Sequence, residues 1–174
     1  EQCREIVHKF NSIYGDVLCA PEAYLSEISR IKGLDGNEKM GKSLGNAIFL
    51  VDDDDTISKK IMSAVTDPNK IKVDDPANPD VCMVYYYHKL LGNDNINKVC
   101  DECKKGKRGC VSCKRELIKI MLEFLKPIRE KRAYYEANLD LVDRILMDGN
   151  KKAKEIAQDT MKKVKKSMKI DYFE

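Results

Sequence analysis

The sequence lacks the features that mark membrane, secreted and repetitive proteins. No apolar run approaches the length of a membrane-spanning helix, and no signal-peptide pattern is present. We find no repeat of fixed period and no low-complexity tract. These absences predict a soluble cytoplasmic protein with no membrane partner. Its 174 residues suit one domain, or a domain with part of another. Because the sequence opens at Glu1 inside a helical pattern, we expect it to be a portion of a longer protein.

The sequence also has little net charge, but its charged residues are unevenly distributed. The formal net charge is +3, yet residues 100–174 carry 20 basic and 13 acidic side chains. Residues 51–99, in contrast, carry 6 basic and 9 acidic side chains. A basic C-terminal segment is the usual footprint of a polyanionic partner, although solvated Lys-rich helix faces give the same pattern. Charge alone leaves both interpretations open.

Apolar residues recur at helical spacing over most of the chain, which predicts a mostly α protein. One stripe ends before Gly15, and another follows the acidic residues 52–55 and ends at Asp67 and Pro68. Three later stripes, at 117–125, 139–146 (closed by Gly149) and 153–168, are expected to form core. Residues 17–20 predict a short buried strand, and the four glycines within 30–46 predict a mobile loop.

The glycine-rich segment formally satisfies a nucleotide-binding P-loop, G-x-x-x-x-G-K-S, over residues 36–43. We reject that interpretation, because a P-loop needs a buried strand before it and a long helix directly after it. Here the short polar segment 29–33 precedes the pattern, and Gly45 and Asn46 follow at once. Residues 39–43, Lys-Met-Gly-Lys-Ser, better match the Lys-Met-Ser-Lys-Ser signature of class I aminoacyl-tRNA synthetases, with Gly41 where serine is usual.

The segments around this signature resemble tryptophanyl-tRNA synthetases, and the resemblance covers essentially the whole chain. It is carried by residues 31–36, 44–48, 62–68 and 127–132. It implies ATP-dependent ligation of L-tryptophan to its tRNA through tryptophanyl-adenylate, with ATP and Mg²⁺ as cofactors. In that reaction, negative charge grows on the departing pyrophosphate, and two ammonium groups on a mobile loop can close on it. The resemblance assigns this catalytic role to Lys39 and Lys42, and ATP binding to Ile31, Lys39, Met40, Gly41, Lys42 and Ser43.

The family's first signature, His-Ile-Gly-His, is missing, since only His8 and His88 occur and neither fits it. The resemblance therefore implies an incomplete enzyme that is inactive alone. Residues 1–52 would end a Rossmann-like catalytic domain, and residues 53–174 would form an α-helical anticodon-binding domain. Tryptophan would bind to the missing N-terminal half, through which the family usually forms homodimers.

Four of the seven cysteines lie within residues 100–113, and without a secretory signal they favour a metal over disulfides. The paired C-x-x-C motifs of Cys100, Cys103, Cys110 and Cys113 are typical of a zinc site. The family resemblance implies instead a [4Fe-4S] cluster, as some bacterial members carry, bound by Cys82, Cys103, Cys110 and Cys113. Zinc and unliganded thiols remain alternatives.

By resemblance, the basic helical end should bind tryptophan tRNA at its anticodon. Stacked bases and phosphates need planar and cationic partners, and the candidate contacts are Lys107, Arg108, Arg129 and Arg132. The alternative function is a non-enzymatic, metal-stabilised RNA-binding module.

Overall fold

The computed structural model describes residues 1–25, 28 and 30–172, and these residues are mostly helical. They form six α-helices and two short 3₁₀ turns, and the described ranges contain no strand. The predicted mostly α fold is therefore confirmed. Contacts divide the chain into two compact units, residues 27–134 and residues 1–26 with 135–174. The predicted domain boundary between residues 52 and 53 concerns a longer protein and stays a prediction.

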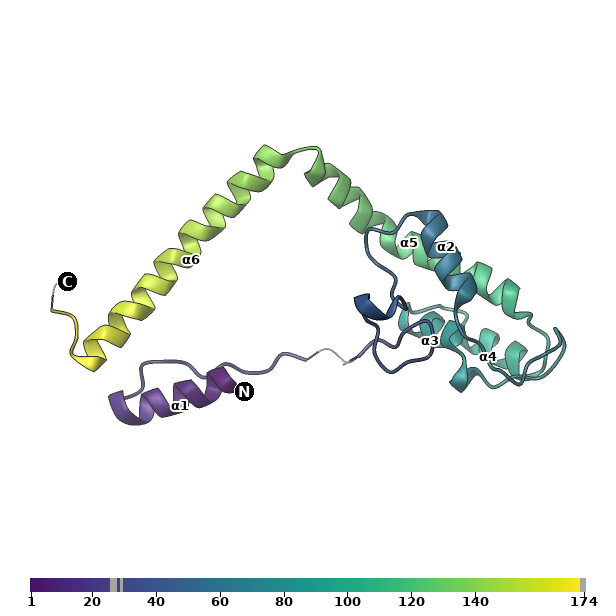
Figure 1. The fold of residues 1–174 in the computed structure, drawn as a ribbon, viewed down its shortest axis with the longest axis horizontal. Coiled ribbons are helices and arrows are strands. Elements are labelled where there is room, and N and C mark those ends of the chain that lie inside the picture. The colour runs from purple at the N-terminus through teal and green to yellow at the C-terminus, as the bar shows by residue number, and fades with distance from the viewer. Residues whose placement is uncertain (26–27, 29, 173–174) are drawn as a thin grey trace. The chain divides into compact units, whose positions relative to one another are not determined.

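The unit of residues 27–134 is assembled along one long helix, α5 (Cys110–Glu136). Figure 1 shows α2 (Asp54–Ser63), α3 (Met83–Leu90) and α4 (Ile96–Lys104) gathered against the first part of α5. Two 3₁₀ turns complete the unit, η1 (Lys42–Leu44) and η2 (Pro79–Val81). The connections are irregular, so side chains and single backbone hydrogen bonds position most of the loops.

The core of this unit follows the predicted stripe on α5. Leu117, Met121 and Leu125 are buried at four-residue spacing, which places them on one face of the helix. They pack in one cluster with the buried side chains of the three shorter helices, Ile57, Ile61, Val84, Tyr87 and Val99. Removal of this apolar surface from water is the main force that holds the four helices together.

The acidic residues before α2 cap this helix as predicted. The Asp53 side chain accepts a hydrogen bond from Thr56 N at 2.7 Å, and Asp54 and Asp55 lie in the positive first turn. The predicted end at Asp67 and Pro68 is too late, because Ala64 leaves the helical conformation at φ −57°, ψ 140°.

The residues after α2 form a non-helical junction, residues 64–67. Val65 N donates to Leu34 O at 2.9 Å, and Val65 O accepts from Met83 N at 3.0 Å. The buried carboxylate of Asp67 accepts from Asn78 N at 2.6 Å and from Asn69 N at 2.9 Å, and these hydrogen bonds lower its pKa. The junction therefore ties α2, α3 and the segment around Leu34 together.

In the other unit, α1 (Gln2–Tyr14) ends as predicted at Gly15, whose φ of +88° suits glycine. The buried strand predicted for residues 17–20 is wrong. Asn11 explains the difference, because its side chain accepts from Val17 N and Leu18 N and donates to Leu18 O at 2.7 Å. The amide replaces the neighbouring strand that such a segment would need.

The helix α6 (Leu139–Met168) differs from the prediction in two ways. It runs unbroken through Gly149, because a mid-helix glycine costs only about 1 kcal/mol relative to alanine. Its apolar stripes were expected to be core, but none of its residues is buried, and Leu139 and Ile156 are 65% and 70% exposed. Among the described residues, no helix is long and apolar enough to cross a membrane.

We expect Leu117→Ala to lower the free energy of unfolding of the unit of residues 27–134 by about 2–5 kcal/mol, because it leaves a cavity in a closed core. Phe124→Ala, on the exposed side of the same helix, should cost less than about 1 kcal/mol. Urea denaturation of the two variants measures the difference, and equal losses would contradict the described core.

Candidate functional site

The lysine signature loop is organised around one buried amide, that of Asn46, which is 4% exposed. Its Oδ1 accepts from Gly41 N at 2.9 Å, and its Nδ2 donates to Asp35 Oδ1 at 2.9 Å and to Lys39 O at 3.2 Å. Asn46 O also accepts from Leu34 N at 3.0 Å. The amide thus fixes the backbone of residues 39–41, while the Lys39 and Lys42 side chains remain exposed.

Two further features fit this arrangement. A Cβ at Gly33 would lie 2.1 Å from Asn46 Nδ2, so only glycine allows the amide to come this close. The end of the signature lies in the three-residue turn η1, which begins at Lys42 and is capped by Gly45 at φ +66°. The long helix that a P-loop needs is not there, which agrees with the rejection of that interpretation.

The predicted ATP-binding residues are only partly brought together. Ile31, Lys39 and Met40 line one open groove with Arg30, and Met40 N donates to Ile31 O at 3.0 Å. Gly41, Lys42 and Ser43 do not line this groove, although they follow it directly in the chain. Two tyrosines of helix α3 bind the backbone next to this groove. Tyr87 Oη donates to Lys32 O at 2.5 Å, and Tyr86 Oη donates to Arg30 O at 3.3 Å.

A second site lies where the ends of three helices meet. Cys82 caps the N-terminus of α3, Cys103 lies near the C-terminal end of α4, and Cys110 and Cys113 occupy the first turn of α5. These four cysteines line one small cavity of about 20 Å³, together with Arg108. Cys100 does not line it and lies next to Tyr85, whose pKa is raised by burial and by this thiol.

The environment of the four thiols is mostly apolar. Burial raises the pKa of Cys82 and Cys103, and raises that of Cys113 to about 12. Hydrogen bonds from the backbone N–H groups of Tyr85, Val84 and Asp67 act in the opposite direction on the pKa of Cys82. The thiols of Cys82, Cys103 and Cys113 are therefore protonated at neutral pH, and a metal that binds them must displace protons.

The residues fit a metal–thiolate group in their chemistry but are not yet arranged around a single ion. Four thiols converge with a buried guanidinium whose Nε has no hydrogen-bond partner in the described part of the chain. Within the same residues, no group of three or more His, Cys, Asp or Glu side chains is placed to hold one metal ion. A cubane cluster binds each thiolate through a different iron, so its ligands stand further apart than those of zinc.

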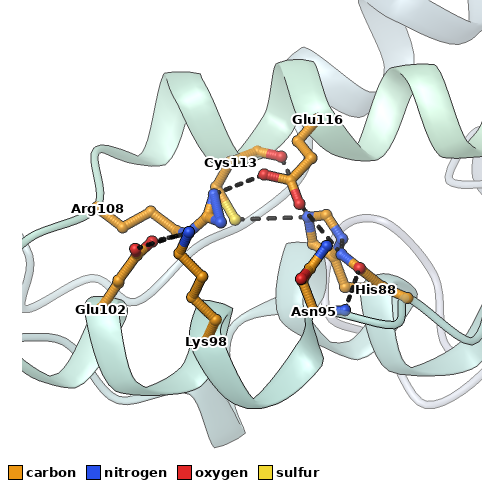
Figure 2. Close-up of polar contacts among 8 residues, drawn as sticks. His88, Asn95, Lys98, Glu102, Arg108, Cys113 and Glu116 are labelled. Atoms are coloured by element: carbon orange, nitrogen blue, oxygen red, sulfur yellow. Dashed lines mark hydrogen bonds and ion pairs between the residues drawn. The ribbon is translucent and has the colours of Figure 1, made fainter.

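A chain of polar contacts runs from Arg108 through Glu116, Asn93 and His88 to Cys113 of this cavity (Figure 2). Asn93 Oδ1 accepts from Asn95 N, so its Nδ2 is the donor to His88 Nδ1 at 2.8 Å and to Glu116 Oε1 at 3.2 Å. The proton of neutral His88 is then on Nε2, which lies 3.2 Å from Cys113 O and 3.5 Å from Cys113 Sγ. Burial lowers the pKa of His88, which agrees with a neutral ring.

Two carboxylates hold the guanidinium of Arg108. Its Nη1 donates to Glu116 Oε2 at 2.8 Å, and its Nε lies 3.2 Å from Glu102 Oε2. The second contact is an ion pair but not a hydrogen bond, because the Nε hydrogen is not directed at the carboxylate. Arg108 faces the cavity, so a contact with RNA would require its ion pairs to break.

The other predicted RNA contacts differ in their surroundings. Lys107 is exposed, whereas Arg129 is bound to Asp54 at 2.5 Å and to Asp52 O at 3.3 Å. Arg132 is exposed near the C-terminal end of α5. Sequence reasoning missed an open basic groove of about 500 Å³ outside the cysteine cavity, whose cations are Lys70, Lys72 and Arg115. It also missed Asn46, Asn93 and Glu116, whose roles depend on contacts that spacing does not reveal.

Comparisons with known proteins agree with these observations. The chain is 42% identical to a tryptophan–tRNA ligase of Aquifex aeolicus over 98% of its own length and 43% of that protein. It is 44% identical to the corresponding protein of Lactococcus lactis over 99% of its length and 53% of that protein. The chain therefore spans about half the length of the curated relatives it matches.

A solved structure gives the same result. The tryptophanyl-tRNA synthetase of Campylobacter jejuni, complexed with ADP and tryptophan, aligns with a TM-score of 0.79 and 29% identity over 95% of this chain and 51% of that chain. The family described as tRNA synthetases class I (W and Y) matches residues 1–126. This match covers more than half of the chain, which therefore belongs to the class I tRNA synthetases of the W and Y type.

Proposed function

We propose that this chain supplies the ATP-facing lysine loop and the tRNA-binding helical part of an ATP-dependent tryptophan–tRNA ligase. The observation that carries the proposal is the signature loop, whose backbone Asn46 holds while Lys39 and Lys42 stay exposed. Relatives named tryptophan–tRNA ligase support the choice of amino acid. A cytoplasmic location and a homodimer, the family's usual form, belong to the same proposal.

In the activation step, the carboxylate of tryptophan attacks the α-phosphate of ATP and pyrophosphate leaves. Negative charge increases on the leaving group, so cations that reach it in the transition state accelerate the reaction. Lys39 and Lys42 supply two such cations, Ser43 adds a hydroxyl donor, and Mg²⁺ neutralises phosphate charge. Ile31 and Met40 form the apolar part of the groove beside Lys39. That the chain alone does not form the adenylate stays a prediction.

For the tRNA, we propose that the groove of Lys70, Lys72 and Arg115 binds phosphates. Lys107, and Arg129 and Arg132 further along α5, would add contacts to the RNA. The exposed apolar side chains of Ile71 and Val73 lie on the same groove. Cations beside apolar surface suit a single-stranded loop, whose phosphates and unstacked bases need both. The cavity and the groove share Cys110, so an occupied cavity would also stabilise the groove.

For the cysteines, we propose that Cys82, Cys103, Cys110 and Cys113 bind a [4Fe-4S] cluster with a structural role. The shared cavity supports this set over the zinc set, which needs Cys100. The cluster would cross-link the ends of α3, α4 and α5 through four metal–sulfur bonds. Aminoacylation requires no electron transfer.

In the full-length protein, Lys42→Ala should lower tryptophan-dependent pyrophosphate exchange by about 10²- to 10³-fold while tryptophan affinity changes little, because its charge acts in the transition state. Lys32→Ala is the matched control on the same loop. It loses only an ion pair with Glu38 at 2.9 Å, and the rate should fall less than about fivefold. Equal losses of rate and affinity in Lys42→Ala would assign the loop to ground-state binding.

Arg115→Ala should weaken binding of tryptophan tRNA and reduce the slope of log affinity against log salt by about 0.7, the value for one phosphate contact on a single strand. Lys59→Ala removes an exposed lysine on α2 outside the groove and should leave the slope unchanged. Filter binding at several salt concentrations measures both. Identical slopes for Arg115→Ala and wild type would exclude the groove from the RNA contact.

Protein purified without oxygen should be brown, with iron and sulfide each near about four per chain, as a cubane requires. Cys82→Ser should lose the colour and Cys100→Ser should keep it. Colourless protein with one zinc ion, lost in Cys100→Ser and kept in Cys82→Ser, would favour the paired C-x-x-C zinc site instead.

A further inference from the structure

A metal group bound in the cysteine cavity would carry negative charge that needs a nearby cation. Four thiolates around a zinc ion, or around an oxidised four-iron cluster, leave a net charge of about −2. An anion in a cavity this apolar is costly unless a cation compensates it. The cavity wall consists otherwise of neutral side chains, namely Thr66, Val84, Tyr85 and Val99.

Arg108 is the charged residue in the described wall of the cavity. Its side chain is only 11% exposed, whereas those of its partners Glu102 and Glu116 are 31% and 35% exposed. Solvent therefore screens the carboxylates more than the guanidinium.

One hydrogen-bond donor of the guanidinium is also unused among the described residues. Nη1 is used by Glu116, but the buried Nε–H has no hydrogen-bond acceptor among the described residues. Such an orphaned donor is costly and therefore unusual in a folded protein. A thiolate or sulfide in the adjoining cavity is an acceptor of the right charge.

The position of the guanidinium is fixed from both sides (Figure 2). Glu102 on α4 and Glu116 on α5 hold it, and Glu116 is held in turn by Asn93. Asn93 binds His88, which contacts Cys113. The contacts form a chain that leads from the guanidinium to a cysteine of the cavity, so they position the cation relative to that thiol.

We propose that Arg108 is the charge-compensating residue of the metal–thiolate centre, with its buried Nε–H as a donor to the bound sulfur atoms. This inference rests on the proposed metal centre, but it holds for an iron–sulfur cluster and for zinc. It assigns Arg108 to the cavity instead of to the RNA surface. The chain of His88, Asn93 and Glu116 then positions this cation.

Cobalt(II) tests the proposal, because its tetrathiolate complexes show a sulfur-to-metal absorption band. Metal-free, reduced protein would be titrated with Co²⁺ under a competing chelator. We expect Arg108→Met to weaken Co²⁺ binding by about 10- to 100-fold, the usual effect of losing a residue that supports metal ligands. Lys107→Met makes the same charge change at the adjacent, exposed position and should change the affinity less than about twofold, since solvent screens that charge.

Two further variants separate charge from folding. Arg108→Lys keeps the charge but not the Nε–H and should lie between wild type and Arg108→Met. If Arg108→Met does not fold by far-UV circular dichroism, Arg108→Gln removes the charge and keeps a donor for Glu116. Wild-type affinity in a folded, uncharged variant, or an equal loss in Lys107→Met, would overturn the proposal. Wild-type protein that gives no thiolate band and, when purified without oxygen, holds no iron and sulfide would instead contradict the metal centre itself. If it holds iron and sulfide without giving the band, the same variants are compared by the iron and sulfide that they retain.

Discussion

The arrangement of residues 27–134 depends on the junction after α2, where the backbone of Val65 is bound on both sides. Its N–H binds Leu34 next to the lysine loop, and its carbonyl binds Met83 at the start of α3. Neither bond belongs to a helix or a sheet. Without a sheet in the described residues, these two bonds do locally what a strand would do. They set the position of the signature loop relative to the helical core.

The same junction reaches the second site. Asp67 closes the loop to Asn78 with its carboxylate, and its backbone N–H is directed at the Cys82 sulfur. Cys103 O accepts from Ala77 N at 3.2 Å, which brings the end of α4 to that loop. Gly106 approaches Asp74 so closely that a Cβ would lie 2.0 Å from the Asp74 carbonyl oxygen. A group that cross-links the cysteines would therefore also stabilise the junction, so the lysine loop and the cavity share one support.

Local patterns predicted the parts of the structure that local energies decide. The apolar stripe of Leu117, Met121 and Leu125, the Asp53 cap and the stop at Gly15 all follow from periodicity and backbone preference. The prediction that a helix ends at Gly149 was wrong, because the free-energy cost of one glycine is small against a long run of helix-forming neighbours. The prediction that the apolar stripes of α6 are buried was also wrong, because periodicity identifies an apolar face but not what covers it. Asn46 and the partners of Arg108 act through tertiary contacts, so no sequence spacing indicates them. Arg108 was therefore predicted from its neighbouring lysines to contact RNA.

The departure of Gly41 from the usual serine of the signature can be judged from the geometry of the loop. Its backbone is extended at φ −149°, ψ 143°, a conformation that any residue adopts, so no strain requires glycine. A Cβ there would meet Leu44 Cδ1 at 3.4 Å, an ordinary contact. The essential interaction of this position is its N–H, which donates to Asn46 Oδ1 and is independent of the side chain. The substitution therefore removes one hydroxyl and leaves intact the anchor that holds the backbone between Lys39 and Lys42.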